Sequence, residues 1–262
     1  MIRKHLIPFA IGLSLLVMAK VFAHTQPTGK TNLKNSIVLA DNTVKTNYEE
    51  EEEEFTIEDL EFANEGLPEG DQRVANKMKQ VLASYGYENL QSTRLYRKAT
   101  EWFPVIEPIL AKHGIPNDFK YIPLVESGFR EGVSPKGAAG IWQFMPATAK
   151  GYGLKVNAKV DERYNLKKST EAACKYLKEL HRIFGSWTLV AAAYNVGDNH
   201  LKKQITRQNQ DNYFKMKLNR ETGAYVYKLM SVKEILENPK RNGYKNQKAL
   251  IAYNENPSFT ME

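Results

Sequence analysis

The sequence predicts a mainly α-helical fold, on three observations. Apolar residues recur with helical spacing over residues 71–85, 92–113, 169–184 and 187–195. Residues that begin and end helices stand at the borders of these stretches, with Gly185 closing one and Ser186 opening the next. The run Ala191 to Ala193 is small enough for another helix to pack closely against it, which predicts that 187–195 is the buried central helix.

Two helices are expected before the central part of the chain. The first covers residues 71–85 and ends at Gly86. The second covers 92–113 and ends at Gly114, but Pro104 and Pro108 lie inside it. Because proline removes a backbone donor and clashes with the preceding turn, we expect this stretch to be kinked or split in two.

Three further helical stretches follow. A short helix over 118–127 should be kinked or begin late, because of Pro123, and Gly128 is a candidate for its C-terminal cap. Another short helix covers 148–152, after a loop rich in glycine, proline and alanine over 131–146. The last helical stretch is 212–236.

The two ends of the chain suggest export and a loose tail. Basic residues 3–4, an apolar stretch over 6–18 and the Val-Phe-Ala of 21–23 predict a signal peptide over 1–23. The alternative, an uncleaved membrane anchor, is disfavoured because the apolar run is shorter than the ~20 residues that span a bilayer. No cysteine lies near the cleavage site, which argues against a lipoprotein and favours the periplasm. Residues 237–262 read as a C-terminal tail.

Charge divides the rest of the chain. Residues 24–70 hold 3 basic and 12 acidic residues and few large apolar ones, so they are expected to form an acidic disordered linker. Residues 71–262 hold 31 basic and 18 acidic residues, and 71–236 are long enough for one domain with a core. A basic domain suits an anionic polymer, which is nucleic acid in the cytoplasm and the cell wall after export. A basic nucleic-acid-binding protein is disfavoured by the signal peptide and by the lack of a nucleic-acid-binding motif.

Several chemistries lack their residues. Cys174 is the only cysteine, so an internal disulfide is excluded, and its place on the apolar face of 169–184 predicts a buried, inert thiol. The five histidines are scattered without metal-ligand spacing, so no metal site is predicted. No nucleophilic serine elbow or nucleotide-binding fingerprint is present.

Glu126 is the candidate catalytic residue. It falls in the last turn of the predicted 118–127 helix, at the negative end of the helix dipole, and its sequence neighbours are largely apolar. Both features favour the neutral acid and raise its pKa, as a general acid working near neutral pH requires. On this segment alone, a surface glutamate on an amphipathic helix is the alternative reading.

Three motifs downstream of Glu126-Ser127 favour the catalytic reading. They are Gly-Ala-Ala-Gly-Ile-Trp-Gln-Phe-Met-Pro at 137–146, Ala-Tyr-Asn-Val-Gly at 193–197 and Glu-Thr-Gly-Ala-Tyr-Val at 221–226. Trp142 in the first motif suits either a sugar-stacking platform or the core. In this order and spacing the motifs offer one carboxylic acid, a glycine-rich turn with an amide and a thioether, and a Tyr-Asn pair.

From about residue 102 to 226 this set resembles the catalytic domain of the lytic transglycosylases of glycoside hydrolase family 23. The stretch 120–129 is most similar to the membrane-bound lytic transglycosylase D type. The resemblance implies a goose-type-lysozyme-like fold, here with extra N-terminal helices, and an enzyme acting on peptidoglycan without a cofactor. It implies Glu126 as the catalytic acid and base, and the substrate-binding residues Ser127, Gln143, Met145, Tyr194, Asn195 and Tyr225.

The resemblance also implies a mechanism with one carboxylate, whereas most glycosidases use two. Glu126 would protonate the β-1,4 glycosidic oxygen between N-acetylmuramic acid and N-acetylglucosamine, and then accept a proton from the C6 hydroxyl as a 1,6-anhydro ring closes. Asp161, Glu162 and Glu221 remain open as partner carboxylates. Two alternatives remain: a hydrolytic muramidase of the same fold, and a peptidoglycan-binding module without turnover.

Overall fold

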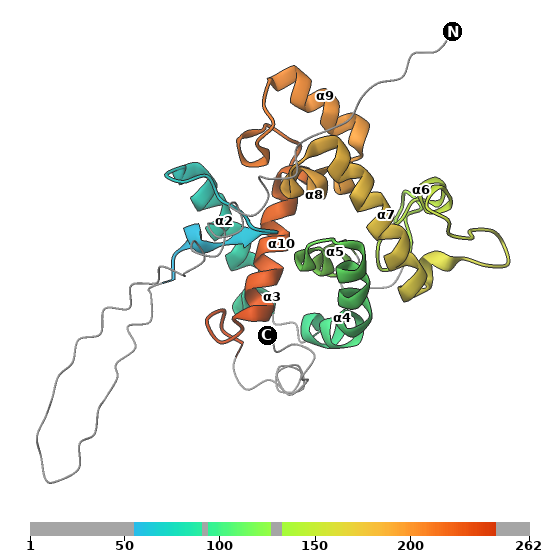
Figure 1. The fold of residues 1–262 in the computed structure, drawn as a ribbon. Helices are drawn as coiled ribbons and strands as arrows, with labels where there is room; N and C mark the ends of the chain where they lie inside the picture. Colours follow the sequence, from blue (N-terminus) through green and yellow to red (C-terminus); the bar gives the residue numbers. More distant parts are fainter. Residues whose placement is uncertain (1–54, 91–93, 127–132, 245–262) are drawn as a thin grey trace, which may run out of the picture. The chain divides into compact units, whose positions relative to one another are not determined.

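The computed structural model describes residues 55–90, 94–126 and 133–244, and these residues are mainly helical (Figure 1). The predicted signal peptide, Ser127 and Gly128 lie outside the described residues. The helices are α2 Gln72–Tyr85, α3 Tyr87–Leu90, α4 Arg94–His113, α5 Ile122–Glu126, α6 Pro146–Gly151, α7 Leu166–Phe184, α8 Trp187–Val196, α9 Asp198–Gln208 and α10 Thr222–Glu237. Short 3-10 helices are η1 Ile57–Asp59, η2 Asn117–Tyr121, η3 Glu162–Tyr164 and η4 Tyr213–Lys215, and strands β1 Glu61–Phe62 and β2 Glu65–Gly66 form a hairpin.

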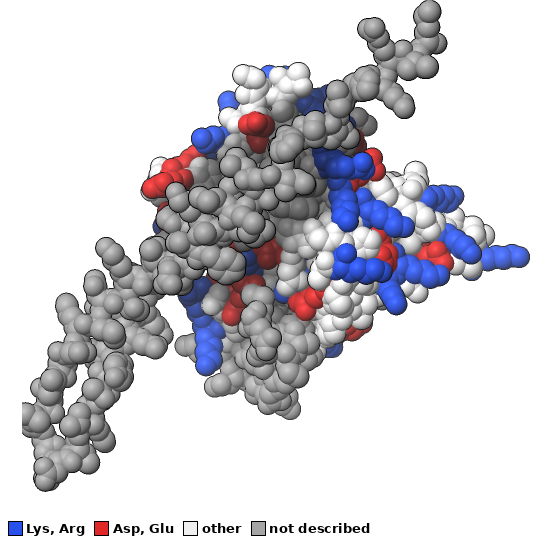
Figure 2. All heavy atoms as spheres, in the orientation of Figure 1, with Lys and Arg blue, Asp and Glu red and all other residues white. Residues whose placement is uncertain are grey.

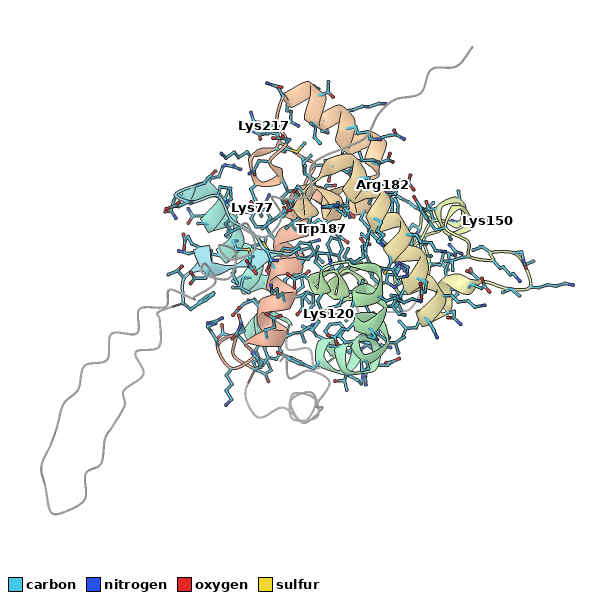
Figure 3. All side chains as sticks on the ribbon, in the orientation of Figure 1. Lys77, Lys120, Lys150, Arg182, Trp187 and Lys217 are labelled. Carbon is cyan, nitrogen blue, oxygen red and sulfur yellow. The ribbon has the colours of Figure 1, made fainter. Side chains whose placement is uncertain are left out.

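Two long helices organise the packing. Helix α10 packs against α2 and α8, and α7 packs against α4 and α8. In Figure 1, α10 lies between α2 on one side and α4 and α5 on the other. Side chains fill the space between these helices, and even Lys120 is buried there, where it bonds to Glu107 at 2.8 Å (Figure 3). Within the described residues, none of the helices combines the length and apolar character needed to cross a bilayer.

Helix α8 is buried, as expected, from Thr188 to Ala193. Two side chains accept hydrogen bonds from the free backbone N–H groups at its N-terminus. Ser186 Oγ accepts a hydrogen bond from the backbone N–H of Leu189 at 3.4 Å. The carboxylate of Glu65, from the hairpin, accepts the N–H groups of Trp187 and Thr188. An anion at a helix N-terminus satisfies free donors and opposes the dipole, so the hairpin stabilises α8.

The expectation that residues 55–70 belong to a disordered linker is wrong. Phe62 is fully buried and packs on Phe119, with ring centroids 5.1 Å apart. The hairpin turns through Ala63 and Asn64, both with positive φ, and the N–H of Ala63 donates to Asp118 at 2.7 Å. The large apolar residues within 55–70 thus pack in or against the core, a property that composition alone does not show. Residues 24–54 lie outside the described part.

The first residues of the predicted C-terminal tail, up to Tyr244, pack against the helices, and residues 245–262 lie outside the described part. Tyr244 is buried between the rings of Tyr87 and Tyr96, at 5.3 Å from each, and its hydroxyl donates to the Tyr85 carbonyl at 3.0 Å. Arg241 pairs with the buried carboxylate of Glu234 at 2.7 Å. These polar and aromatic contacts order residues 237–244 without a helical pattern.

Other boundaries differ in instructive ways. Helix α4 runs unbroken through Pro104 and Pro108, because a broad apolar face that includes Trp102 and Phe103 is buried along its length. The stretch 212–236 begins as η4 and becomes helical only at Thr222, whose N–H donates to Asn219 Oδ1. Helix α9 was not predicted, because it has a single buried residue and therefore no apolar pattern with helical spacing. The helices predicted over 71–85, 169–184 and 187–195 are confirmed within a few residues.

Candidate active site

The candidate acid Glu126 stands at the end of a short helix in a buried segment. Pro116 precedes η2, which passes directly into α5 at Ile122, so the helix begins late, as one of the two alternatives predicted. Pro123 then lies in the first turn, where its missing N–H costs nothing. Ile122 and Leu124 are buried, and Glu126 is the last helical residue and partly exposed. The core therefore anchors the helix while its final side chain reaches the surface.

Glu126 has a raised pKa, as expected, of about 7. Burial is the largest cause, because it disfavours the carboxylate. The hydroxyl of Tyr225 donates to Glu126 Oε1 at 2.6 Å and lowers the pKa, the charge of Glu221 raises it, and the charge of Lys228 lowers it. The result is a carboxyl group that is substantially protonated near neutral pH and can also lose its proton there.

Helix α10 supplies the three side chains that act on the acid. Glu221 stands just before its first turn, and Tyr225 and Lys228 follow at helical spacing, so all three share one face. The Tyr225 hydroxyl is buried, and its own pKa is raised well above the usual value by burial and by Glu126. Tyr225 is therefore a neutral donor to the carboxylate.

Helix α8 brings the Tyr-Asn pair to the same region. Tyr194 donates to the Trp142 carbonyl at 2.7 Å, and Glu126 is among the charges that raise its pKa. Asn195 donates to Glu221 at 3.4 Å and accepts from Thr222 Oγ1 at 2.9 Å. Thus Tyr194 links α8 to the glycine-rich loop, and Asn195 links it to α10.

The glycine-rich loop is a tight turn rather than an open loop. Ala139 and Phe144 exchange backbone hydrogen bonds at 3.1 and 3.2 Å. Gly140 has a φ of +76°, and a Cβ there would lie 2.0 Å from the Arg163 carbonyl oxygen, so only glycine fits. Gln143 also has a positive φ, of 47°, and its amide Nε2 donates to the Gly140 carbonyl at 2.7 Å. A left-handed glutamine is strained, and such strain often marks a functional site.

Arg163 holds this turn together, a role that the sequence did not reveal. Its Nη1 donates to the carbonyls of Gly137 and Phe144 at 2.8 and 3.0 Å. Asp161 pairs with the same guanidinium at 2.7 Å, so this acid is structural and not a free partner for Glu126. Glu162 likewise pairs with Lys168 at 2.6 Å. Of the three open partner carboxylates, Glu221 is the one that acts on Glu126.

Three other residues singled out in the sequence lie in different surroundings. Trp142 is fully buried and donates its indole N–H to Thr170 at 2.9 Å, so it belongs to the core and is not a stacking platform. Met145 is 42% exposed at the start of α6. Cys174 is buried, and burial raises the pKa of its thiol to about 12, which agrees with an inert side chain. Among the described residues, no group of three or more His, Cys, Asp or Glu side chains is placed to hold a metal ion.

Comparison with known proteins identifies the class of this domain. Residues 104–217 match the transglycosylase SLT domain family. The chain therefore carries a transglycosylase SLT domain, and the prediction of a mainly helical, lysozyme-like fold is confirmed. The matched segment includes Glu126, the glycine-rich loop and the Tyr-Asn pair, and it ends before Tyr225.

The chain is similar to membrane-bound lytic murein transglycosylase D of Escherichia coli strain K12, with 34% identity over 184 residues. That alignment covers 68% of this chain and 40% of the relative, and the protein of the same name from E. coli O6:H1 gives the same figures. A putative tributyltin chloride resistance protein of Alteromonas sp. strain M-1 is 31% identical over 134 residues, 49% of this chain and 65% of that protein. The resemblance to the D type is confirmed, and this chain spans about 40% of the length of the E. coli relatives.

Proposed function

We propose that this protein is a peptidoglycan lytic transglycosylase that cleaves the β-1,4 bond between N-acetylmuramic acid and N-acetylglucosamine and leaves 1,6-anhydro ends. The observation that carries the proposal is Glu126, a partly exposed carboxyl group with a pKa of about 7 and a tyrosine donor 2.6 Å away. The SLT domain match and the similarity to a named lytic murein transglycosylase support the substrate.

In the first step, Glu126 acts as general acid. The protonated carboxyl gives its proton to the glycosidic oxygen as the bond to the anomeric carbon breaks, and the 2-acetamido group of the N-acetylmuramic acid assists at that carbon. Glu126 becomes a carboxylate, and Tyr225 stabilises it through the hydrogen bond that the structure shows. The negative charge of Glu221 favours the protonated starting state.

In the second step, the same carboxylate acts as general base. It takes the proton from the C6 hydroxyl of the sugar, the C6 oxygen bonds to the anomeric carbon, and the acetamido group is released. Glu126 is then protonated again, so a single residue completes the cycle. A pKa near 7 suits both roles, because neither protonation state is strongly disfavoured at neutral pH.

The side chains around Glu126 have proposed binding roles. Asn195 and Tyr194 at the end of α8, Gln143 in the strained turn and the exposed Met145 would contact the glycan, together with Ser127, which follows the acid in the sequence. Arg163 would act indirectly, as a positioning residue that fixes the turn. We further propose that the protein works after export, at the cell wall in the periplasm.

Digestion of purified peptidoglycan, followed by mass analysis of the muropeptides, tests the proposal. Anhydro products lack the mass of one water relative to hydrolytic products, so the assay separates a transglycosylase from a muramidase. Glu126→Gln should lose activity by at least the ~10²–10⁴-fold typical of general acid–base catalysis while still binding glycan strands. The matched control is Glu179→Gln, which removes an exposed carboxylate on α7 that also accepts a hydrogen bond from a tyrosine.

Each other outcome has a distinct meaning. Products one water heavier than the anhydro products would identify a hydrolase. Strand binding without cleavage by the unchanged protein would support a binding module. Full activity of Glu126→Gln would remove the catalytic assignment of this residue.

A further inference from the structure

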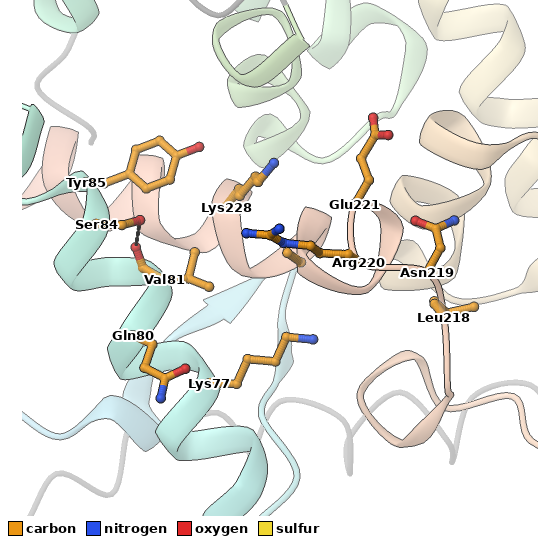
Figure 4. A pocket seen from close by; sticks show the side chains of 11 residues that line it. Lys77, Gln80, Val81, Ser84, Tyr85, Leu218, Asn219, Arg220, Glu221 and Lys228 are labelled. Atoms are coloured by element: carbon orange, nitrogen blue, oxygen red, sulfur yellow. Dashed lines mark hydrogen bonds between the residues drawn. The ribbon is translucent and has the colours of Figure 1, made fainter.

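A hollow lies between α2 and the start of α10. It has a volume of about 660 Å³, and Figure 4 shows side chains from both helices surrounding it. All of α2 precedes the segment that matches the SLT domain family, and the other lining residues follow that segment, so the hollow is built from parts of the chain that flank the matched segment. Its lining residues are Lys77, Gln80, Val81, Ser84, Tyr85, Leu218, Asn219, Arg220, Glu221, Ala224 and Lys228.

The hollow is cationic. Lys77, Arg220 and Lys228 line it, against one carboxylate, Glu221. Within the described part of the chain, neither Arg220 nor Lys228 forms an ion pair with a carboxylate. Glu221 instead accepts a hydrogen bond from Asn195. Positive charge that is not neutralised within a concave site favours an anionic ligand.

One of the cationic side chains, Lys77, is held in place. Lys77 Nζ donates to the backbone carbonyl of Gly223 at 2.6 Å and lies 4.9 Å from the centre of the Tyr227 ring. In Figure 4, Lys77 rises from α2, and the Arg220 guanidinium lies between it and Lys228. A ligand carboxylate would therefore meet one ammonium group that is already held in place, which reduces the entropy lost on binding.

The walls of the hollow are apolar. Val81 and Tyr85 come from α2, and Leu218 and Ala224 come from the segment around the start of α10. A ligand that matches this lining has a carboxylate and short aliphatic side chains. A neutral sugar would satisfy neither the cations nor the apolar wall.

Two residues of the hollow also act on the candidate acid. Glu221 and Lys228 line it, and the charges of the same two residues act on Glu126. In Figure 4, the side chains of Glu221, just before α10, and Lys228, on α10, point toward the same side. A group bound in the hollow would therefore be attached to a sugar close to the scissile bond.

We propose that this hollow binds the peptide stem of the substrate through the stem carboxylates. The inference rests on the proposed function, because it takes peptidoglycan as the substrate. Each N-acetylmuramic acid carries a short peptide on its lactyl group, with aliphatic side chains and free carboxylates. The hollow matches that chemistry, and it makes Arg220 and Lys77 specificity-determining residues that do not take part in bond cleavage.

The test compares three substrates: intact peptidoglycan, peptidoglycan whose stem carboxylates have been amidated, and glycan strands stripped of stems by an amidase. The protein should have a kcat/KM on intact substrate that is roughly 5- to 10-fold higher than on either of the others, as expected for one or two charge-assisted hydrogen bonds near the surface. Arg220→Gln should reduce that ratio toward one, mainly through KM. Lys203→Gln, which removes an exposed charge on α9, should keep the ratio of the unchanged protein.

The outcomes separate this proposal from the proposed function. Cleavage of all three substrates at equal rates would overturn the stem site and leave the transglycosylase standing. Cleavage of none would overturn the proposed function itself. Stripping exposes the lactyl carboxylate, so a preference for stripped strands that Arg220→Gln abolishes would assign the hollow to that carboxylate and overturn the stem proposal. Circular dichroism of Arg220→Gln confirms that a lost preference does not reflect unfolding.

Discussion

Replacing Tyr225 with phenylalanine should move the pH range in which the enzyme works. The hydroxyl donates to Glu126 at 2.6 Å and stabilises the carboxylate, so it lowers a pKa that burial has raised to about 7. Phenylalanine keeps the buried ring and removes only this bond. The pKa of Glu126 must then rise, and the acid stays protonated to higher pH.

The size of the shift follows from the strength of the bond. A hydrogen bond to a charged group contributes about 1.5–3 kcal/mol, and one pKa unit corresponds to about 1.4 kcal/mol. Because Glu126 is partly exposed, water replaces some of the lost stabilisation, and we expect the low end of that range. The pKa should therefore move up by about one unit, from about 7 to about 8.

The assay is kcat/KM on soluble glycan fragments between pH 4 and pH 9. For the unchanged protein, activity should fall as pH rises through about 7, because the acid must start protonated. The fall should occur about one unit higher in Tyr225→Phe. Tyr152→Phe is the control, because it removes a tyrosine that donates to a different carboxylate, Glu179, at 2.7 Å. An unchanged or acid-shifted profile in Tyr225→Phe would refute the assignment of Glu126 as the acid.

Four other outcomes are expected. Activity should persist in EDTA, because the proposed steps move protons only through Glu126; strict dependence on added metal would contradict them. Glu126→Gln should raise the free energy of unfolding at pH 8 by on the order of 2–3 kcal/mol and leave it unchanged at pH 4, because a pKa raised from 4.5 to about 7 by folding means stability that is lost as pH rises between these two values. Equal melting temperatures of the variant and the unchanged protein at both pH values would count against a raised pKa. Glu65→Gln should cost about 1–2 kcal/mol in chemical denaturation, because it weakens an anion at a helix start. Since the Glu65 pKa is lowered, that loss should shrink as pH falls below its usual value of 4.5, and a loss independent of pH would refute the charge argument. Gly137→Ala should lower the free energy of unfolding by about 1–2 kcal/mol, because a Cβ there meets nothing within 4 Å and only the positive φ opposes alanine. Gly140→Ala should lower it by more, because a Cβ there meets the Arg163 carbonyl. Equal losses would show that the Arg163 backbone moves aside at little cost.

Much of the site was predictable because its motifs are local. Glu126 lies among apolar neighbours, and Gly140 lies in a run of small residues, so a buried acid and a tight turn can be read from the sequence. Tyr225 could be assigned only through family resemblance, since its contact with Glu126 joins residues 99 positions apart. Lys228 could have been found from its spacing of three residues after Tyr225 on a helix.

The parts that could not be predicted depend on single polar contacts between distant residues. Arg163 looks like one residue of a polar connection, yet it bonds two carbonyls of the glycine-rich turn. Glu65 belongs to an acidic stretch, and its role at α8 depends on a hairpin of only two short strands. Composition averages over such stretches, so it does not indicate that the Glu65 carboxylate binds the start of α8.

The anchoring of α8 by Glu65 has a consequence for what counts as the smallest working unit. Glu65 precedes the segment matched by the SLT family, and Tyr225 follows it. A fragment cut to the matched borders would keep the acid but lose the carboxylate that supports the start of α8 and the tyrosine that donates a hydrogen bond to the acid. Transplanting the activity into another protein would require the stretch from the hairpin through α10 as an indivisible piece.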